Sequence, residues 1–299
     1  MAGFRNIREW ATASDNGQEW YLLLNKGFSP NLSITGRHYD WTTVGGNPAA
    51  NYYASSPLVA AVLDSGSRPY LPDVAPYKQG ICSITMTVWT LNTSATNGLG
   101  GSYNLNDYLL YYPFIDFTAV GEEQLMTNIV TLPRSSDGKG VKMMLVAQSS
   151  VVGSGSMAVT YINQDGVQKT TPTFFINSTQ TSGELCSCMA TASVGPTEFI
   201  PLAAGDSGVR SVVSANVITD GGGIGAIVLV KPLTKIFAGD ASSRITTGTI
   251  STGSFVQVQA VIDGPPITLD DGAFLGFVGW HPTTQATSKI IAEFKTVWN

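Results

Sequence analysis

The strongest chemical signature in the chain is Gly205–Gly208, whose letters Gly-Asp-Ser-Gly also surround the nucleophile of chymotrypsin-like serine proteases. That chemistry needs a histidine base and backbone N–H groups that stabilise an oxyanion. His38 lacks the small-residue context of the protease histidine, and His281 follows the serine, which is the wrong chain order. Asp and Ser also bond readily to their own backbone in turns. We therefore predict a turn around Ser207.

Cysteines and glycine-rich loops are the next candidates, for a metal ion and for a nucleotide. Cys186 and Cys188 could offer two thiolates, with Cys82 as a third, but their spacing matches no Cys-x₂-Cys zinc motif. Cysteine is also a small apolar residue that is often buried. The glycines of 220–225 precede Ala226–Val230, which predicts a strand, whereas a dinucleotide loop opens a helix. We predict no metal site and no cofactor.

The acidic residues are few and scattered, with Glu122–Glu123, Asp263 and Asp270–Asp271 as the candidates for paired catalysis. Two carboxyl groups at the correct separation would suit a glycosidase. Nothing in the sequence brings two of them together, and Asp-Gly pairs are typical of turns. We predict a non-enzymatic protein; a hydrolase that uses Ser207 or a carboxylate pair is the alternative.

The low charge of the chain points to assembly. Only 12% of its 299 residues are charged while 43% are hydrophobic, against roughly 25% charged residues in ordinary soluble domains. A surface with so few charges is commonly buried against partners, since interspersed charge keeps free monomers soluble. A β-rich monomer that stays soluble through hydroxyl and amide groups is the alternative.

The charge balance and the apolar pattern also exclude several partners. The net charge is −5 and no Lys/Arg run occurs, so nucleic-acid binding is not expected. No apolar stretch of 18 residues occurs, so no membrane span is expected. Three cysteines argue against a disulfide framework. We expect a protein made in a reducing cytoplasm, or exported only within a larger particle.

The N-terminal quarter predicts a helix followed by an arm. Phe4, Ile7 and Trp10 recur at helical spacing, and Ser14–Gly17 stops that pattern. Residues 25–80 contain six prolines, a density that disfavours long regular elements. We predict a short helix and an extended, Pro-rich arm over residues 1–80.

Residues 81–299 predict an all-β core. Alternating apolar and β-branched residues, separated by Asp-Gly and Gly-Gly turns, are typical of short strands. These strands indicate a β-sandwich of jelly-roll type, built as one core or as two packed β subdomains. The expected strands are Ile81–Trp89, Val141–Val146, Met157–Ile162, Thr171–Ile176, Val209–Ile218, Ala226–Val230, Ser254–Ile262, Ala273–Trp280 and Lys289–Trp298. Tyr108–Ile115 is expected to be a buried strand or a tight corner.

Aromatic residues beside prolines supply the candidate contact points. Tyr and Trp are favoured in interface cores because they combine a large area with a polar tip, although the same rings also fill protein cores. The predicted interface residues are Phe4, Ile7, Trp10, Asn51, Tyr52, Tyr53 and Tyr111.

Several strings of the sequence resemble a widespread group of tailed-bacteriophage virion proteins. They are Asn47–Tyr53, Asp107–Asp116, Thr131–Arg134, Asp137–Gly140, Thr160–Gly166, Leu202–Ser211 and Leu229–Leu233, in the same order. The resemblance spans most of residues 45–280 and carries no catalytic residue. It implies a component of the virus particle.

Within that group we expect a head decoration, or cement, protein. Such proteins are seated on the outer surface of the head, clasp subunits of the major capsid protein, are often trimers, and use arms to bridge neighbours. A Pro-rich arm before a β-sandwich fits that plan. A tail or baseplate protein that binds host-surface glycans fits equally well and is the alternative. The major capsid protein itself is less favoured, because the common phage shell fold needs a long spine helix.

Overall fold

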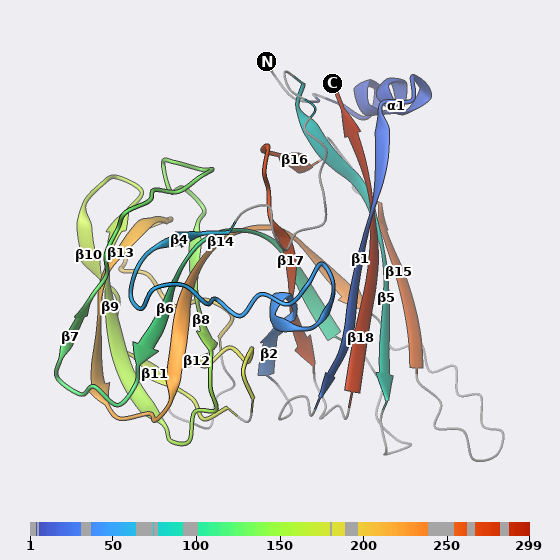
Figure 1. Cartoon of the computed structure of the whole chain (residues 1–299). Helices are drawn as coiled ribbons and strands as arrows, with labels where there is room; N and C mark the ends of the chain where they lie inside the picture. The colour runs from blue at the N-terminus through green and yellow to red at the C-terminus, as the bar shows by residue number, and fades with distance from the viewer. Residues whose placement is uncertain are drawn as a thin grey trace, which may run out of the picture.

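Antiparallel pairing joins the strands into three sheets of six strands each (Figure 1). The computed structural model describes residue 4 and residues 6–30, 37–63, 74, 77–91, 101–179, 181–188, 197–238, 254–261, 267–281 and 287–299. Within these ranges the helical elements are α1 (Ile7–Asp15) and a 3-10 turn at Trp41–Thr43. The predicted all-β sandwich with a short N-terminal helix is therefore confirmed.

The first sheet, called the terminal sheet, contains strands from both ends of the chain. Its order is β15 (Ser254–Val261), β5 (Gln79–Leu91), β18 (Thr287–Trp298), β1 (Glu19–Pro30) and β3 (Gly46–Asn47), and β16 (Ile267–Leu269) also pairs with β5. The pairing of β1 with β18 runs from Glu19 opposite Val297 to Pro30 opposite Thr287.

The second sheet, called the central sheet, has the order β2 (Arg37–Asp40), β17 (Leu275–His281), β6 (Gly101–Asp116), β14 (Ile224–Ala238) and β8 (Lys142–Ala147), and β4 (Ala61–Val62) also pairs with β6. The third, called the distal sheet, has the order β12 (Ser187–Cys188), β11 (Phe174–Ile176), β9 (Gly155–Asn163), β13 (Val209–Thr219) and β7 (Glu123–Leu125), and β10 (Gln168–Thr170) pairs with β9.

The central sheet contributes to both main cores. One core packs it against the terminal sheet, where the rings of Phe277 and Phe294 stack with centroids 5.9 Å apart. The other core packs it against the distal sheet, through residues such as Tyr112, Met143 and Tyr161. The long β6–β14 pair passes through both, with three register shifts along its length. Such bulges bend a strand and increase its twist, which lets one ladder serve two sandwiches (Figure 1).

Residues 41–63 form a strap that runs across the middle of the molecule (Figure 1). Backbone hydrogen bonds fix it to the central sheet, as from the Leu63 amide to the Leu109 carbonyl. Under the strap lies a third cluster, in which Tyr53, Tyr108 and Phe274 are buried. The predicted extended arm corresponds to this strap, which lies on its own chain.

The predicted arm over residues 1–80 needs a correction at β1. This strand lies between β18 and β3 inside the terminal sheet, so residues before 80 and after 81 build the same sheet. The prolines do not prevent it, because Pro30 is the last residue of the strand. A missing N–H there interrupts no interior hydrogen bond.

The strand predictions match β5, β6, β8, β9, β13, β14, β15, β17 and β18. The exception is Thr171–Ile176, where only Phe174–Ile176 is strand. Thr171 uses its hydroxyl to accept a hydrogen bond from the Val159 amide at 3.0 Å, and Pro172 has no N–H to continue the ladder.

In the part of the chain that the structure describes, no helix is long and apolar enough to cross a bilayer.

The core between the terminal and central sheets can be tested with matched phenylalanines. Phe277 is fully buried against Phe294, so we expect Phe277→Ala to lower the free energy of unfolding by about 3–5 kcal/mol. Phe237 is 68% exposed, and Phe237→Ala should change it by less than about 0.5 kcal/mol. Denaturant unfolding measures both, and equal effects would contradict the assigned core.

Candidate functional site

The Gly-Asp-Ser-Gly segment is a closed turn whose backbone donors are already used. The Gln164 side-chain oxygen accepts hydrogen bonds from the Ser207 and Gly208 amides, each at 3.0 Å. A pair of adjacent N–H groups is the device that stabilises an oxyanion in acyl transfer. Here an internal amide oxygen takes both hydrogen bonds, so the turn prediction is confirmed.

Asp206 of the same turn also has a structural role. Its carboxylate accepts hydrogen bonds from the Tyr161 hydroxyl at 2.5 Å and from the Asn163 side-chain Nδ2 at 2.8 Å. The Tyr161 hydrogen bond is the main reason that the pKa of Asp206 lies below its ordinary value. Gly208 has to be glycine, because a Cβ there would collide with the Gly138 carbonyl oxygen.

The other catalytic candidates are dispersed. His38 and His281 lie on β2 and β17 of the central sheet, whereas Ser207 precedes β13 of the distal sheet. Asp270 forms an ion pair with Lys78 at 3.6 Å. Glu123 accepts a hydrogen bond from Ser214 at 2.7 Å, and Asp263 lies outside the described residues.

The cysteines and the glycine loop have structural surroundings. Cys82 and Cys186 are buried free thiols, and burial raises the pKa of each. The side chain of Cys188 lies outside the described residues. Among the described side chains, no group of three or more His, Cys, Asp or Glu residues is placed to hold a metal ion. The glycines of residues 220–223 connect β13 to β14, so a strand follows them and not a helix. These two strands lie in different sheets and do not pair, so the loop is not the β-hairpin that the glycine pattern also suggests.

A buried carboxylate, Asp40, organises the polar groups beneath the strap. It accepts hydrogen bonds from the Thr42 amide at 2.9 Å, the Thr42 hydroxyl at 2.8 Å, the Tyr108 hydroxyl at 2.8 Å and the Tyr53 hydroxyl. Burial raises the pKa of Asp40, and these donors oppose the shift. The strap is thereby bonded to β2 and β6 at one point.

A buried ammonium, Lys26, lies beside this network. Its Nζ donates to the carbonyl oxygens of Thr42, Val44, Pro48 and Ala49 at 3.4, 3.2, 2.8 and 3.3 Å. The residue is 2% exposed, and burial lowers its pKa to about 8 while the Asp40 charge opposes that shift. The sequence contains a signal for this burial, because side chains alternate between the two faces of a strand. Leu22, Leu24 and Lys26 therefore lie on the same, inward face of β1.

A buried ion pair joins two of the strings that resemble the phage proteins. Arg134 forms a bidentate pair with Asp107, at 2.9 Å from Nε and 2.8 Å from Nη2. Asp107 also accepts from the Phe274 amide at 2.9 Å, and Arg134 donates to the Tyr108 carbonyl at 2.8 Å. Sequence reasoning did not find this pair, because its members are distant in the chain.

The structure corrects two of the predicted interface residues. Tyr53 is 1% exposed and Tyr111 is 8% exposed, and their rings pack against each other under the strap with centroids 5.3 Å apart. Their hydrophobic area is used within the chain, so neither is an exposed contact. By contrast, Tyr52 is 66% exposed, and Asn51 is partly exposed.

The N-terminal candidates pack mainly onto the terminal sheet. Phe4 is buried with Ala13, Cys82 and Val297, and Trp10 packs against this group. The side chain of Ile7 lies outside the described residues. The helix therefore fixes the end of the sheet, and only part of Trp10 is open to a partner.

The outer face of the terminal sheet carries two half-exposed apolar side chains among polar ones. Leu22 and Leu24 are buried toward the central sheet, so Tyr21 and Leu23 point to the opposite side of β1. Tyr21 is 57% exposed and Leu23 50% exposed. Lys295 on neighbouring β18 lies over the Tyr21 ring, 5.8 Å from its centroid.

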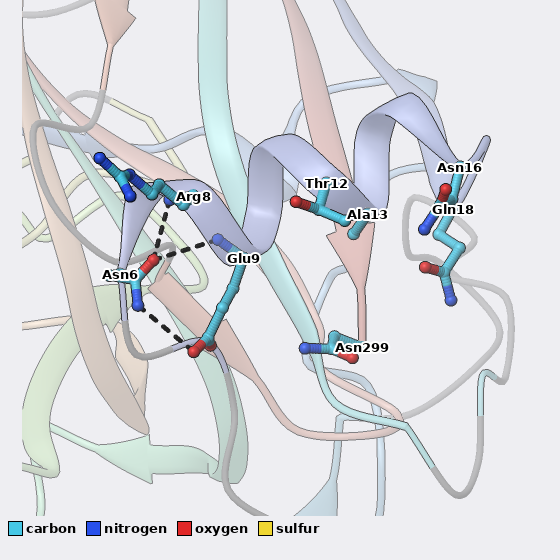
Figure 2. Close-up of a pocket in the computed structure, with 8 residues that line it drawn as sticks. All are labelled: Asn6, Arg8, Glu9, Thr12, Ala13, Asn16, Gln18 and Asn299. Atoms are coloured by element: carbon cyan, nitrogen blue, oxygen red, sulfur yellow. Dashed lines mark hydrogen bonds between the residues drawn. The ribbon is translucent and has the colours of Figure 1, made fainter.

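An open pocket of about 320 Å³ lies beside α1 (Figure 2). Most of its lining residues are polar, and they combine the helix with the last described residue; the residues are Asn6, Arg8, Glu9, Thr12, Ala13, Asn16, Gln18 and Asn299. Asn6 caps the helix by accepting from the Arg8 and Glu9 amides at 2.9 and 3.1 Å. The pocket offers amide and hydroxyl groups for polar contacts.

Comparisons with known proteins give little beyond this geometry. No protein-family model and no curated protein matches the sequence. The structure of the infectious bursal disease virus VP2 subviral particle has 10% identity and a TM-score of 0.18, covering 94% of this chain and 82% of that chain. The T=1 particle derived from the same virus has 11% identity and a TM-score of 0.18, covering 94% and 80%. An overlap at this level is too low to define a shared fold.

The structural role of the Ser207 turn predicts a large loss of stability for one substitution and a small loss for another. Gln164→Ala removes the acceptor of two amides, and we expect the free energy of unfolding to fall by about 1–3 kcal/mol. Ser207→Ala leaves that acceptor in place and should cost less than about 0.5 kcal/mol. Denaturant unfolding distinguishes them, and a hydrolytic activity that Ser207→Ala abolishes would favour the enzyme alternative instead.

The hydrogen bonds of Lys295 form a tether between α1 and β18, and they predict that the local stability of α1 depends on pH. Lys295 bonds to Glu19 at 2.7 Å and to Ser14 at 2.8 Å, and the Lys295 hydrogen bond is the main reason that the pKa of Glu19 is below its ordinary value of 4.5. The tether therefore stabilises the fold above about pH 4.5, and this stability is lost as the pH falls through the lowered pKa that Glu19 has in the folded protein. Amide exchange in α1 should become faster toward pH 3, after correction for intrinsic rates.

Glu19→Gln supplies the control for this titration. Exchange in α1 of that variant should show no step over the same pH range, because the carboxylate is absent. Identical pH profiles for the two proteins would contradict the tether.

Proposed function

We propose that this chain is a non-enzymatic structural protein of a tailed-phage virion, of the decoration type that covers joints between capsid subunits. The observation that carries the proposal is the pair of half-exposed apolar side chains, Tyr21 and Leu23, on the outer face of the terminal sheet, in a chain of which only 12% is charged. Apolar side chains grouped on an open face favour contact with another protein.

The use of the resemblance strings supports a structural role. Asp107 and Arg134 lie in two of them and form a buried ion pair, and Gln164 and Asp206 lie in two others and close the Ser207 turn. The residues that make these strings distinctive are therefore used to build the fold. Their structural roles account for these residue types without assigning a catalytic reaction to them.

The proposed mechanism is thermodynamic. A decoration protein that binds the closed shell, and not the dissociated subunits, adds its binding free energy to the shell alone. The partners would be the major capsid protein and other copies of this chain, in a trimer or another homo-oligomer. The proposed location is the outer surface of the head, after synthesis in the bacterial cytoplasm.

A tail or baseplate protein that binds host glycans is the second candidate. The polar pocket beside α1 favours it, because amide and hydroxyl groups are suited to sugar hydroxyls. Copy number per virion separates the two. Quantitative gels of purified particles should give hundreds of copies for a head protein, and a dozen or fewer would refute the decoration role.

The docking face can be tested by a charge placed on it. We expect Leu23→Lys to lower occupancy on undecorated capsids by about tenfold or more, because the lysine must be desolvated at the contact. Glu293 lies opposite Leu23, so the variant should keep its unfolding midpoint. Val152→Lys is the matched control, since Val152 is 85% exposed and lies between β8 and β9, away from the terminal sheet. Co-sedimentation with capsids measures occupancy, and equal binding by both variants would contradict this face.

A further inference from the structure

The ammonium of Lys26 is bound as an isolated cation would be. Four backbone carbonyl oxygens surround its Nζ at 2.8–3.4 Å, and within the described residues Lys26 forms no ion pair with a carboxylate. A ring of carbonyl oxygens is the type of ligand set that holds potassium and ammonium ions in proteins. Lysine offers three N–H donors, which these four acceptors share.

The carbonyls come from one short part of the chain. Thr42, Val44, Pro48 and Ala49 all belong to the start of the strap, whereas Lys26 belongs to β1. The intervening backbone is held in this shape independently of the lysine side chain. Asn25 pairs with Asn47, and the Gly27 amide donates to the Gly45 carbonyl at 2.6 Å.

The shape of this segment also requires glycine. Gly46 has a φ of +143°, and a Cβ there would collide with the Asn25 carbonyl oxygen. The backbone turns tightly at this point, so its carbonyls converge on one position while β3 stays paired with β1. The convergence leaves negative ends of several dipoles in a place that water does not reach, because Lys26 is 2% exposed.

The nearby negative charge does not ligate the ammonium. The Asp40 carboxylate is used by four donors from Thr42, Tyr53 and Tyr108, and it acts on Lys26 only through its field. The carbonyl ring therefore makes the direct contacts, and Asp40 supplies a favourable potential behind it.

We propose that residues 42–49 of the strap form a monovalent-cation site of carbonyl oxygens that binds a primary ammonium, and that Lys26 fills this site from β1. The bound ammonium fastens the strap, and with it the central sheet, to the terminal sheet. The ligand class is a primary ammonium or an ion of similar charge and size, such as potassium.

Chemical rescue tests the site directly. Lys26→Ala removes the side chain and leaves the carbonyl ring, so we expect a lower thermal midpoint and faster exchange of the Asn51 amide, which bonds to Thr42. Propylammonium chloride supplies the missing atoms and should raise the midpoint of Lys26→Ala by about 2 °C or more. The same salt should leave the wild-type midpoint unchanged, since its site is filled.

The controls separate charge from volume. 1-Propanol fills the same space without charge, and tetramethylammonium has charge without N–H donors, so neither should rescue Lys26→Ala. Lys231→Ala is the matched variant. The Lys231 Nζ donates to the Ser135 hydroxyl at 3.0 Å and, among the described residues, has no ring of carbonyl oxygens, so this variant should show no rescue. Rescue by 1-propanol equal to that by propylammonium, or no rescue at all, would overturn the proposal.

A measurement on the wild-type protein covers the case in which Lys26→Ala does not fold. In protein labelled with ¹⁵N at lysine Nζ, a caged ammonium should give a slowly exchanging cross-peak with couplings across the hydrogen bonds to backbone carbonyls. Lys26→Arg, which keeps the positive charge, should lose that peak and identify it. A spectrum without such a coupled peak would also overturn the proposal.

Discussion

The fold depends on one constraint: the central sheet must serve two sandwiches at the same time. Its β6–β14 ladder is buried along most of its length, and the register shifts bend it from one core to the other. Polar side chains on such strands have no access to water and need partners inside. Asp40 takes four donors and Asp107 takes a bidentate arginine for this reason. The strap completes this burial, because it covers the face of the central sheet that neither neighbouring sheet covers.

The same constraint explains why a motif with catalytic letters is structural here. The turn at Ser207 precedes β13, which must pair with β9 and β7 in the distal sheet. Gln164, just after β9, binds the two free amides of the turn and so fixes where β13 begins. An acceptor supplied by the chain itself occupies the position that a reacting oxyanion would need. The buried tyrosines beneath the strap are likewise used as hydrogen-bond donors within the core.

Local patterns predicted much of this fold, and long-range pairing limited the rest. Alternation identified most strands, and helical spacing with a stop at Ser14–Gly17 identified α1. The prediction of an arm misjudged β1, because prolines were weighed without the partner strand that β18 provides. Tyr53 and Tyr111 show the same limit: a tyrosine beside a proline suits a surface or a core equally, and only the strap's path decides. Lys26 was within reach of sequence reasoning, since alternation places it on the inward face, but its carbonyl ring depends on the turn at Gly46.

The place of β18 between β1 and β5 sets a time at which the terminal sheet can form. Residues 287–298 are synthesised long after residues 19–30 and 79–91, so both earlier strands wait on the ribosome without their shared neighbour. The distal sheet has no such delay, because its strands, from β7 to β13, lie within one continuous stretch of the chain. Until the last strand arrives, the inward faces of β1 and β5, with Leu22, Leu24 and Ile84, stay uncovered. Synthesis of β18, more than collapse of the core, is then the event that completes the terminal sheet.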